Sequence, residues 1–209
     1  MSNQKNQITE SAVSPVVGVM LMLVVVIIIA AVVSAFAGGQ AESTRKAPSA
    51  SVDIWIETGD SLSDTEINFR HLGGDPIPTD DIQIITYFTN SSGHRYKHTQ
   101  SASGNVSKMY KNAAHDARLP YLADISTGTA SSNPETKDFG NFTFRTGDVM
   151  TTYNLFGMAD LLGVSWTRAS TFEDSTLDDP DLKPGSIIEV KILHTPSGKM
   201  ILEKEVAFR

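Results

Sequence analysis

The chain has 209 residues, with 17 Lys and Arg against 24 Asp and Glu, a net charge of −7 and no cysteine. Without cysteine there are no disulfides, thiolate nucleophiles or cysteine-ligated metal sites. The acidic balance argues against a nucleic-acid partner, because a phosphate-binding surface needs a surplus of Lys and Arg.

A long uncharged segment, residues 11–41, follows the polar stretch MSNQKNQITE at the start of the chain. Its 22 most apolar residues, 16–37, make about 33 Å of helix at about 1.5 Å per residue. A bilayer core about 30 Å thick is spanned by this length. Ser14 and Pro15 are suited to the helix start, since serine caps a first turn and proline needs no N–H partner there. The sequence therefore predicts a membrane-spanning helix over residues 13–40.

Three interpretations are open for this helix. A secretory signal would be shorter and would follow a positive region, although Ala35-Phe36-Ala37 fits the A-x-A pattern of signal peptidase. A plain membrane anchor would need only apolar side chains. The third interpretation is a helix that waits in the membrane and then packs into a bundle of identical helices. Small residues, which let helices approach closely, favour packing; they are Gly18, Ala30, Ala31, Ser34 and Ala35.

The segment AVSPVVGVMLM, followed by a Val/Ile/Ala run, resembles the N-terminal domain of archaeal type IV pilins. This resemblance implies that a prepilin peptidase removes residues 1–12 by cleaving between Ala12 and Val13, while the helix stays in the mature protein. Bacterial pilins carry a glutamate five residues into the mature helix; Val17 stands there in this chain, as in the archaeal branch.

The resemblance also implies partners and a location. The chain is expected to form a helical homopolymer with copies of itself, to be inserted in the membrane before assembly, and to end in an extracellular filament at the cell surface. Pilus assembly machinery, an ATPase and a platform protein, is implied by the family. No nucleic acid is expected as a partner.

The rest of the chain is predicted to be a linker, residues 41–50, and a β-rich head, residues 51–209. Alternating apolar residues in SVDIWIE, EINFRHL, DIQIITYF and NFTFR predict half-buried strands. SIIEVKILH and KMILEKEVAF flank TPSG and predict a closing hairpin, which also resembles the end of archaeal pilin heads. Strands without long intervening helices predict an Ig-like antiparallel β-sandwich, and the whole chain is then α+β.

Two segments of the head do not fit this alternation. Residues 100–140 are rich in Ser, Gly, Asn and Ala and indicate a loop insertion with a short helix near residues 107–118. YNLFGMADLLGVSW is apolar but aperiodic, and is compatible with either a strand or a short helix.

No pattern in the head indicates catalysis or a metal site. The five histidines have no metal-ligand spacing and are expected at the surface; they are His71, His94, His98, His115 and His194. The acidic run EDSTLDDPDLKPG departs from the EF-hand spacing, which favours a solvated loop over a calcium site. We expect no enzyme activity, no catalytic residue, no metal and no cofactor.

Three N-x-S/T sequons lie in the head, at Asn90, Asn105 and Asn141, and are candidate glycosylation sites if the head is outside the cell. The sequence therefore predicts a structural subunit of an archaeal type IV pilus-like filament, with adhesion as its role. A minor pilin or an archaellum-associated stator component would share the helix. The alternative from another class is a membrane-anchored surface binding module.

Overall fold

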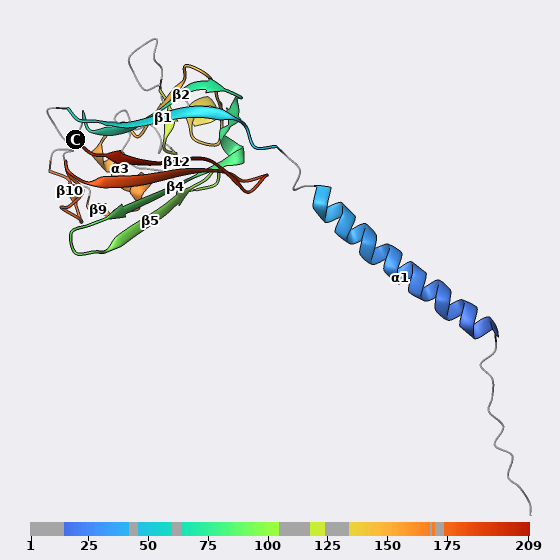
Figure 1. The fold of residues 1–209 in the computed structure, drawn as a ribbon. Helices are drawn as coiled ribbons and strands as arrows, with labels where there is room; N and C mark the ends of the chain where they lie inside the picture. Colours follow the sequence, from blue (N-terminus) through green and yellow to red (C-terminus); the bar gives the residue numbers. More distant parts are fainter. Residues whose placement is uncertain are drawn as a thin grey trace, which may run out of the picture. The chain divides into compact units, whose positions relative to one another are not determined.

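A computed structural model describes residues 15–41, 46–59, 64–104, 118–123, 134–167, 169 and 174–209. The chain divides into two compact units, Met1–Thr44 and Arg45–Arg209. The described part of the first unit is a single long helix, and the second unit is the β head (Figure 1). The α+β class and the antiparallel, sandwich-like head predicted from the sequence are confirmed.

Helix α1 spans Pro15–Ala41 and has no acidic residue in its first turn and no basic residue in its last. Every side chain over residues 15–36 is exposed within its own unit. Apolar side chains surround the helix on all sides, so no stripe marks one face as its buried side. The helix therefore needs an apolar environment that the described part of its own unit does not provide.

The described part of the head contains two four-stranded antiparallel sheets. The first has the order β1 (Ala50–Glu57), β2 (Glu66–Gly74), β8 (Val149–Thr151) and β6 (Tyr121–Leu122). The second has the order β12 (Lys199–Ala207), β11 (Ile187–His194), β4 (Ile82–Thr89) and β5 (Arg95–Gln100). Two short ribbons pair β3 (Ile77–Pro78) with β7 (Thr143–Phe144), and β9 (Trp166–Thr167) with β10 (Thr176–Leu177).

The core lies between the two sheets and follows the alternation seen in the sequence. In β4 every second residue from Ile82 to Phe88 is buried, and β11 alternates in the same way. The neighbouring β1 and β2 bury Ile54 and Phe69, which are paired across the ladder. Each such large side chain contributes about 1.5–3 kcal/mol when fully buried, so the head has a substantial core of its own.

Strands β1 and β12 lie side by side at one edge of the sandwich. Lys204 of β12 places its Nζ 2.6 Å from Asp53 Oδ1 and 3.0 Å from the carbonyl oxygen of Ile54, both in β1. A lysine directed at the seam satisfies an edge carbonyl, and such charges also discourage pairing with foreign strands. The two sheets are thereby joined along this edge.

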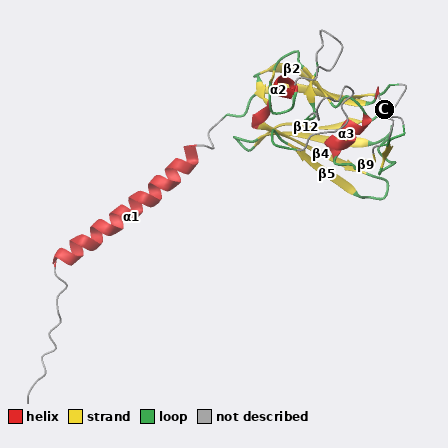
Figure 2. Cartoon of the chain, turned by 180° about the vertical axis from the view of Figure 1, so that it is seen from behind, coloured by secondary structure: helices red, strands yellow, loops and turns green. Residues whose placement is uncertain are grey.

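Helix α3 (Leu155–Leu162) contacts β2 of one sheet and both β4 and β5 of the other (Figure 2). Asn154 caps its start by accepting a hydrogen bond from the Gly157 N–H at 2.8 Å, and Gly163 ends it at φ 73°. At its C-terminal end the Leu161 carbonyl accepts hydrogen bonds from Thr86 Oγ1 at 2.7 Å and from His98 Nδ1 at 3.0 Å. The apolar segment that the sequence left open is therefore a helix, capped at both ends and buried.

The segment 100–140 is more than a loop insertion. It supplies the edge strand β6 and the short helix α2 (Pro134–Lys137), and it buries Leu119, Tyr121 and Phe139. The interpretation as an insertion is thus corrected for its described part. The short helix expected near residues 107–118 falls outside the described residues, except for Arg118, which lies in no helix.

Candidate assembly helix and head surface

Helix α1 is the candidate assembly element. By length and composition, Pro15–Phe36 could cross a membrane: these 22 residues have a mean hydropathy of 3.4 in their most apolar window. A helix that is apolar on every side is stable only where lipid or other helices surround it. Two environments, lipid and a bundle of like helices, meet this requirement.

The small residues of α1 do not all lie on one face. At about 100° per residue, Ala30, Ala31, Ser34 and Ala35 share one side of the helix, whereas Gly18 lies on the other. A Cβ added at Gly18 would meet no atom within 4 Å. The expected packing residues therefore form one compact face near the C-terminal half, plus a separate open position near the start. The expected processing residues, Ala12 and Val13, and the expected capping residue, Ser14, lie outside the described residues.

Asn90 closes the turn between β4 and β5 and is half-buried. Its Nδ2 donates a hydrogen bond to Asp179 Oδ2 at 2.9 Å, and its Oδ1 accepts one from the His94 N–H at 2.8 Å. The hydroxyl and the N–H of Ser91 both bond to Asp181. The two aspartates therefore hold this turn in place, and we call Asn90, Ser91, Asp179 and Asp181 the turn clamp.

The turn clamp changes the interpretation of the acidic run, which contributes Asp179 and Asp181 to it. Asp179 is only 4% exposed, so its part of the run is not a solvated loop. Burial alone would raise the pKa of the Asp179 carboxyl, but hydrogen bonds from the Asp181 N–H, the Asn90 amide and the Tyr96 hydroxyl outweigh it, and the pKa lies below its usual value. Hydrogen bonds from Ser91 lower the pKa of Asp181.

Asn141 lies at a turn and is exposed. Its backbone N–H donates to the carbonyl oxygen of Asp138 at 2.9 Å. The residues on either side of it are fixed to buried Thr79, whose Oγ1 accepts from the Gly140 N–H and donates to the Phe142 carbonyl. The two described sequons thus differ in the environment of their asparagines, and Asn105 lies outside the described residues.

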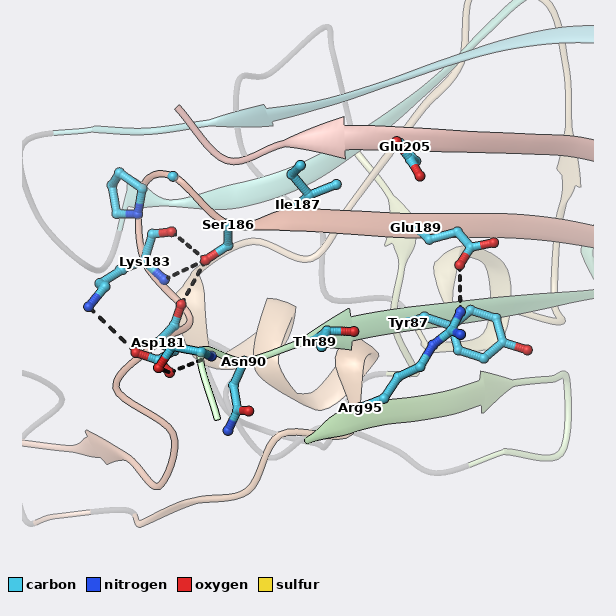
Figure 3. A pocket seen from close by; sticks show the side chains of 13 residues that line it. Tyr87, Thr89, Asn90, Arg95, Asp181, Lys183, Ser186, Ile187, Glu189 and Glu205 are labelled. Carbon is cyan, nitrogen blue, oxygen red and sulfur yellow. Dashed lines mark hydrogen bonds and ion pairs between the residues drawn. The ribbon is translucent and has the colours of Figure 1, made fainter. Parts of the chain in front are cut away.

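An open groove of about 680 Å³ lies where β4, β5 and β11 meet the turn before β11 (Figure 3). Arg95 Nη2 lies 2.7 Å from Glu189 Oε2, and its guanidinium stands 4.2 Å above the Tyr87 ring. On the other side, Lys183 Nζ lies 3.6 Å from Asp181 Oδ1. Arg95 and Lys183 thus each lie beside a carboxylate, that of Glu189 and that of Asp181 respectively. Exposed ion pairs of this kind each contribute at most about 1 kcal/mol to stability.

Two of the four described histidines are buried, which corrects the expectation that all the histidines lie at the surface; His115 lies outside the described residues. His71 is 1% exposed, and its Nε2 lies 3.0 Å from the Asp75 carbonyl oxygen while its ring meets the Phe144 ring edge-on. His194 is 4% exposed and its Nδ1 bonds to the Ser197 hydroxyl. Both occupy inward positions of strands, where these contacts satisfy them. Among the described residues, no three His, Asp or Glu side chains are grouped as metal ligands would be.

The N-terminal part of the chain is similar to a known protein family. Residues 11–52 match the family model described as archaeal type IV pilin, N-terminal. The chain is also 32% identical over 81 residues to an uncharacterized protein of Archaeoglobus fulgidus, a match that covers 39% of this chain and 55% of that relative. The chain thus spans about half the length of the relative. The resemblance of the helical segment to archaeal pilins is confirmed, and the segment that matches includes all of α1.

Proposed function

We propose that this chain is a structural subunit of an archaeal type IV pilus-like surface filament that polymerises through α1. One observation carries the proposal: the segment that matches the pilin N-terminal domain is also a helix whose apolar side chains are all exposed within its own unit over residues 15–36. Such a helix in water would leave many large aliphatic side chains solvated, at about 1.5–3 kcal/mol each.

The physical mechanism follows from this cost. The subunit waits with α1 in the membrane, and α1 leaves lipid only when neighbouring α1 helices replace the lipid contacts. Each new subunit then adds a head-to-tail contact that does not close on itself, and repetition of such a contact generates a helical filament. The face formed by Ala30, Ala31, Ser34 and Ala35 admits close approach of a neighbouring helix.

The head supports a role in display. It has its own core and a surface with net negative charge, and adhesion is the activity we assign to it in the assembled filament. The processing enzyme is a prepilin peptidase that cleaves between Ala12 and Val13, and membrane-bound assembly machinery extracts the processed subunit.

Terminal sequencing of the protein recovered from the cell surface tests the proposal. The expected mature N-terminus is Val13, which retains all of α1. A start at Gly38 would indicate a secretory signal, and an intact Met1 would indicate a plain anchor. Either result would contradict assembly through a processed α1.

A further inference from the structure

The second sheet of the head carries opposite charges on its two outer strands. β5 lies at one margin of this sheet and β12 at the other, with β4 and β11 between them (Figure 1). On β5 the exposed Arg95 and Lys97 are two residues apart, and on β12 the exposed Glu203 and Glu205 are two residues apart. Residues two apart in a strand share one face of the sheet. We call Arg95 and Lys97 the basic margin, and Glu203 and Glu205 the acidic margin.

The register of the sheet places Lys97 and Glu205 in one row. Lys97 stands opposite Tyr87 of β4, which stands opposite Glu189 of β11. Glu189 in turn stands opposite Glu205. Three strand spacings of about 4.8 Å separate the two ends of this row by about 14 Å. The charged ends of Lys97 and Glu205 therefore do not meet within one head.

Glu205 lacks a compensating cation among the described residues. It stands opposite Glu189, and like charges in opposed positions are unfavourable. Arg95 Nη2 and Lys191 Nζ each lie 2.7 Å from the Glu189 carboxylate, so the nearby cations serve Glu189 (Figure 3). Lys97 likewise forms no ion pair within the described part of the chain. Each margin thus presents one exposed charge that is not compensated there, and the two charges are opposite in sign.

We propose that the basic margin of one head contacts the acidic margin of the head of a second copy of this chain, with Lys97 beside Glu205 of the neighbouring copy. Arg95 and Glu203 then lie one row away on either side of this pair. The contact is head-to-tail: each head keeps one margin open for the next copy, so the contact repeats along a filament.

The inference rests on the proposed function, because exposed ion pairs are too weak to join heads by themselves. Polymerisation through α1 brings neighbouring heads to a high effective concentration, at which a weak contact forms. The contact then selects which side of each head meets its neighbour, since like margins repel one another. The head alone remains monomeric.

A carbodiimide, which joins a lysine amine to a carboxylate in direct contact, tests the contact in purified surface filaments of the full-length chain. Mass spectrometry should identify a peptide that joins Lys97 to Glu205, and denaturing electrophoresis should show a ladder of covalent oligomers. The matched control is Lys97→Arg, which keeps the charge but removes the amine. It should form filaments and lose this cross-linked peptide.

The outcomes separate this inference from the proposed function. Filaments of this chain that give no cross-link between the two margins overturn the contact and leave the filament proposal standing. Covalent dimers without higher oligomers would mean a closed contact and would also overturn it. If the chain forms no filaments and stays in the membrane fraction, both proposals fail.

Charge reversal measures whether the contact contributes to assembly. Lys97→Glu and Glu205→Lys each place like charges at the contact, and each should lower filament yield about fivefold or more. The two changes together should restore the yield, even where one of them alone disturbs the head. The control pairs Lys97→Glu with Asp80→Lys, an exposed position in the 3₁₀ turn Thr79–Asp81, which restores the net charge only. Rescue by this control, or unchanged yield from both single variants, would overturn the contact.

Discussion

Helix α1 and the head differ in whether their apolar side chains are buried within their own unit. The head buries its large apolar residues between two sheets and around α3, whereas the apolar side chains of α1 from Val16 to Phe36 remain exposed within their own unit. The stability of the head is therefore internal, and the stability of α1 depends on what surrounds it. Folding and assembly are thus assigned to different parts of one chain.

Removing α1 should have the largest effect, because it removes the assembly surface and leaves the core intact. A fragment of residues 46–209 keeps the Ser49 N–H bond to Asp75 and every described strand. We expect a soluble, monomeric β protein that forms no filaments. Circular dichroism and light scattering measure these properties. Filaments from this fragment would show that the head polymerises, and an unfolded fragment would show that the head needs a partner.

A bulky residue on the face of α1 formed by Ala30, Ala31, Ser34 and Ala35 should have the second largest effect on assembly. Ala31→Phe forces extra volume into a packed helix interface, at about 1–3 kcal/mol per site, and about 1.4 kcal/mol changes an association constant tenfold. Filament yield should fall at least about fivefold, while the protein stays in the membrane fraction because lipid accommodates the ring. Electron microscopy and fractionation measure the two quantities.

The matched control for that change is Ile29→Phe, which adds an aromatic ring on the other side of the helix. We expect a smaller loss of filaments from the control. Equal losses from both variants would mean that the face of Ala30, Ala31, Ser34 and Ala35 has no special role.

Truncation of a core side chain tests whether the head is stabilised by its own core. Phe69 is fully buried in β2, and Phe69→Ala should lower the free energy of unfolding of the 46–209 fragment by about 3–5 kcal/mol. Urea unfolding measures this loss. In the full-length protein Ile28→Ala should leave the unfolding of the head unchanged, since α1 and the head are separate units.

The smallest expected effect is a loss of head stability at low pH that comes from the turn clamp. The pKa of Asp179 is lowered in the folded head, so its contribution to stability is present above the ordinary carboxyl pKa of about 3.9 and is lost as pH falls through the lowered value. The urea midpoint of the fragment should drop between pH 7 and pH 3. Asp179→Asn should make this drop smaller, and an identical drop in both proteins would show that Asp179 does not contribute.

The order of apolar and polar residues along the chain predicted most of the long strands and the long helix. The alternating segments became β1, β2, β4, β11 and β12, and the apolar run became α1. Strand β5 was not among the segments predicted from alternating apolar residues, because its outward positions carry the charged Arg95 and Lys97 and its inward side is only partly covered. Helix α3 was ambiguous because seven of its eight residues are buried, which removes the polar face that marks an amphipathic helix.

Contacts between distant residues could not be predicted in this way. Asn90 and Asp179 are 89 residues apart in the chain, so the sequon gave no sign that its amide is held by a buried carboxylate. His71 of β2 is buried against Phe144, which belongs to the separate β3–β7 ribbon. The apolar helix, by contrast, was evident from composition, whereas its role in assembly was predicted only from the resemblance to archaeal pilins.

Cryo-electron microscopy of purified surface filaments tests most directly whether α1 leaves the membrane to form the core of a filament. We expect a filament whose repeating subunit is this chain, with α1 helices packed at the centre and the β heads outside. Filaments built from a different protein, with this chain remaining in the membrane fraction, would contradict it.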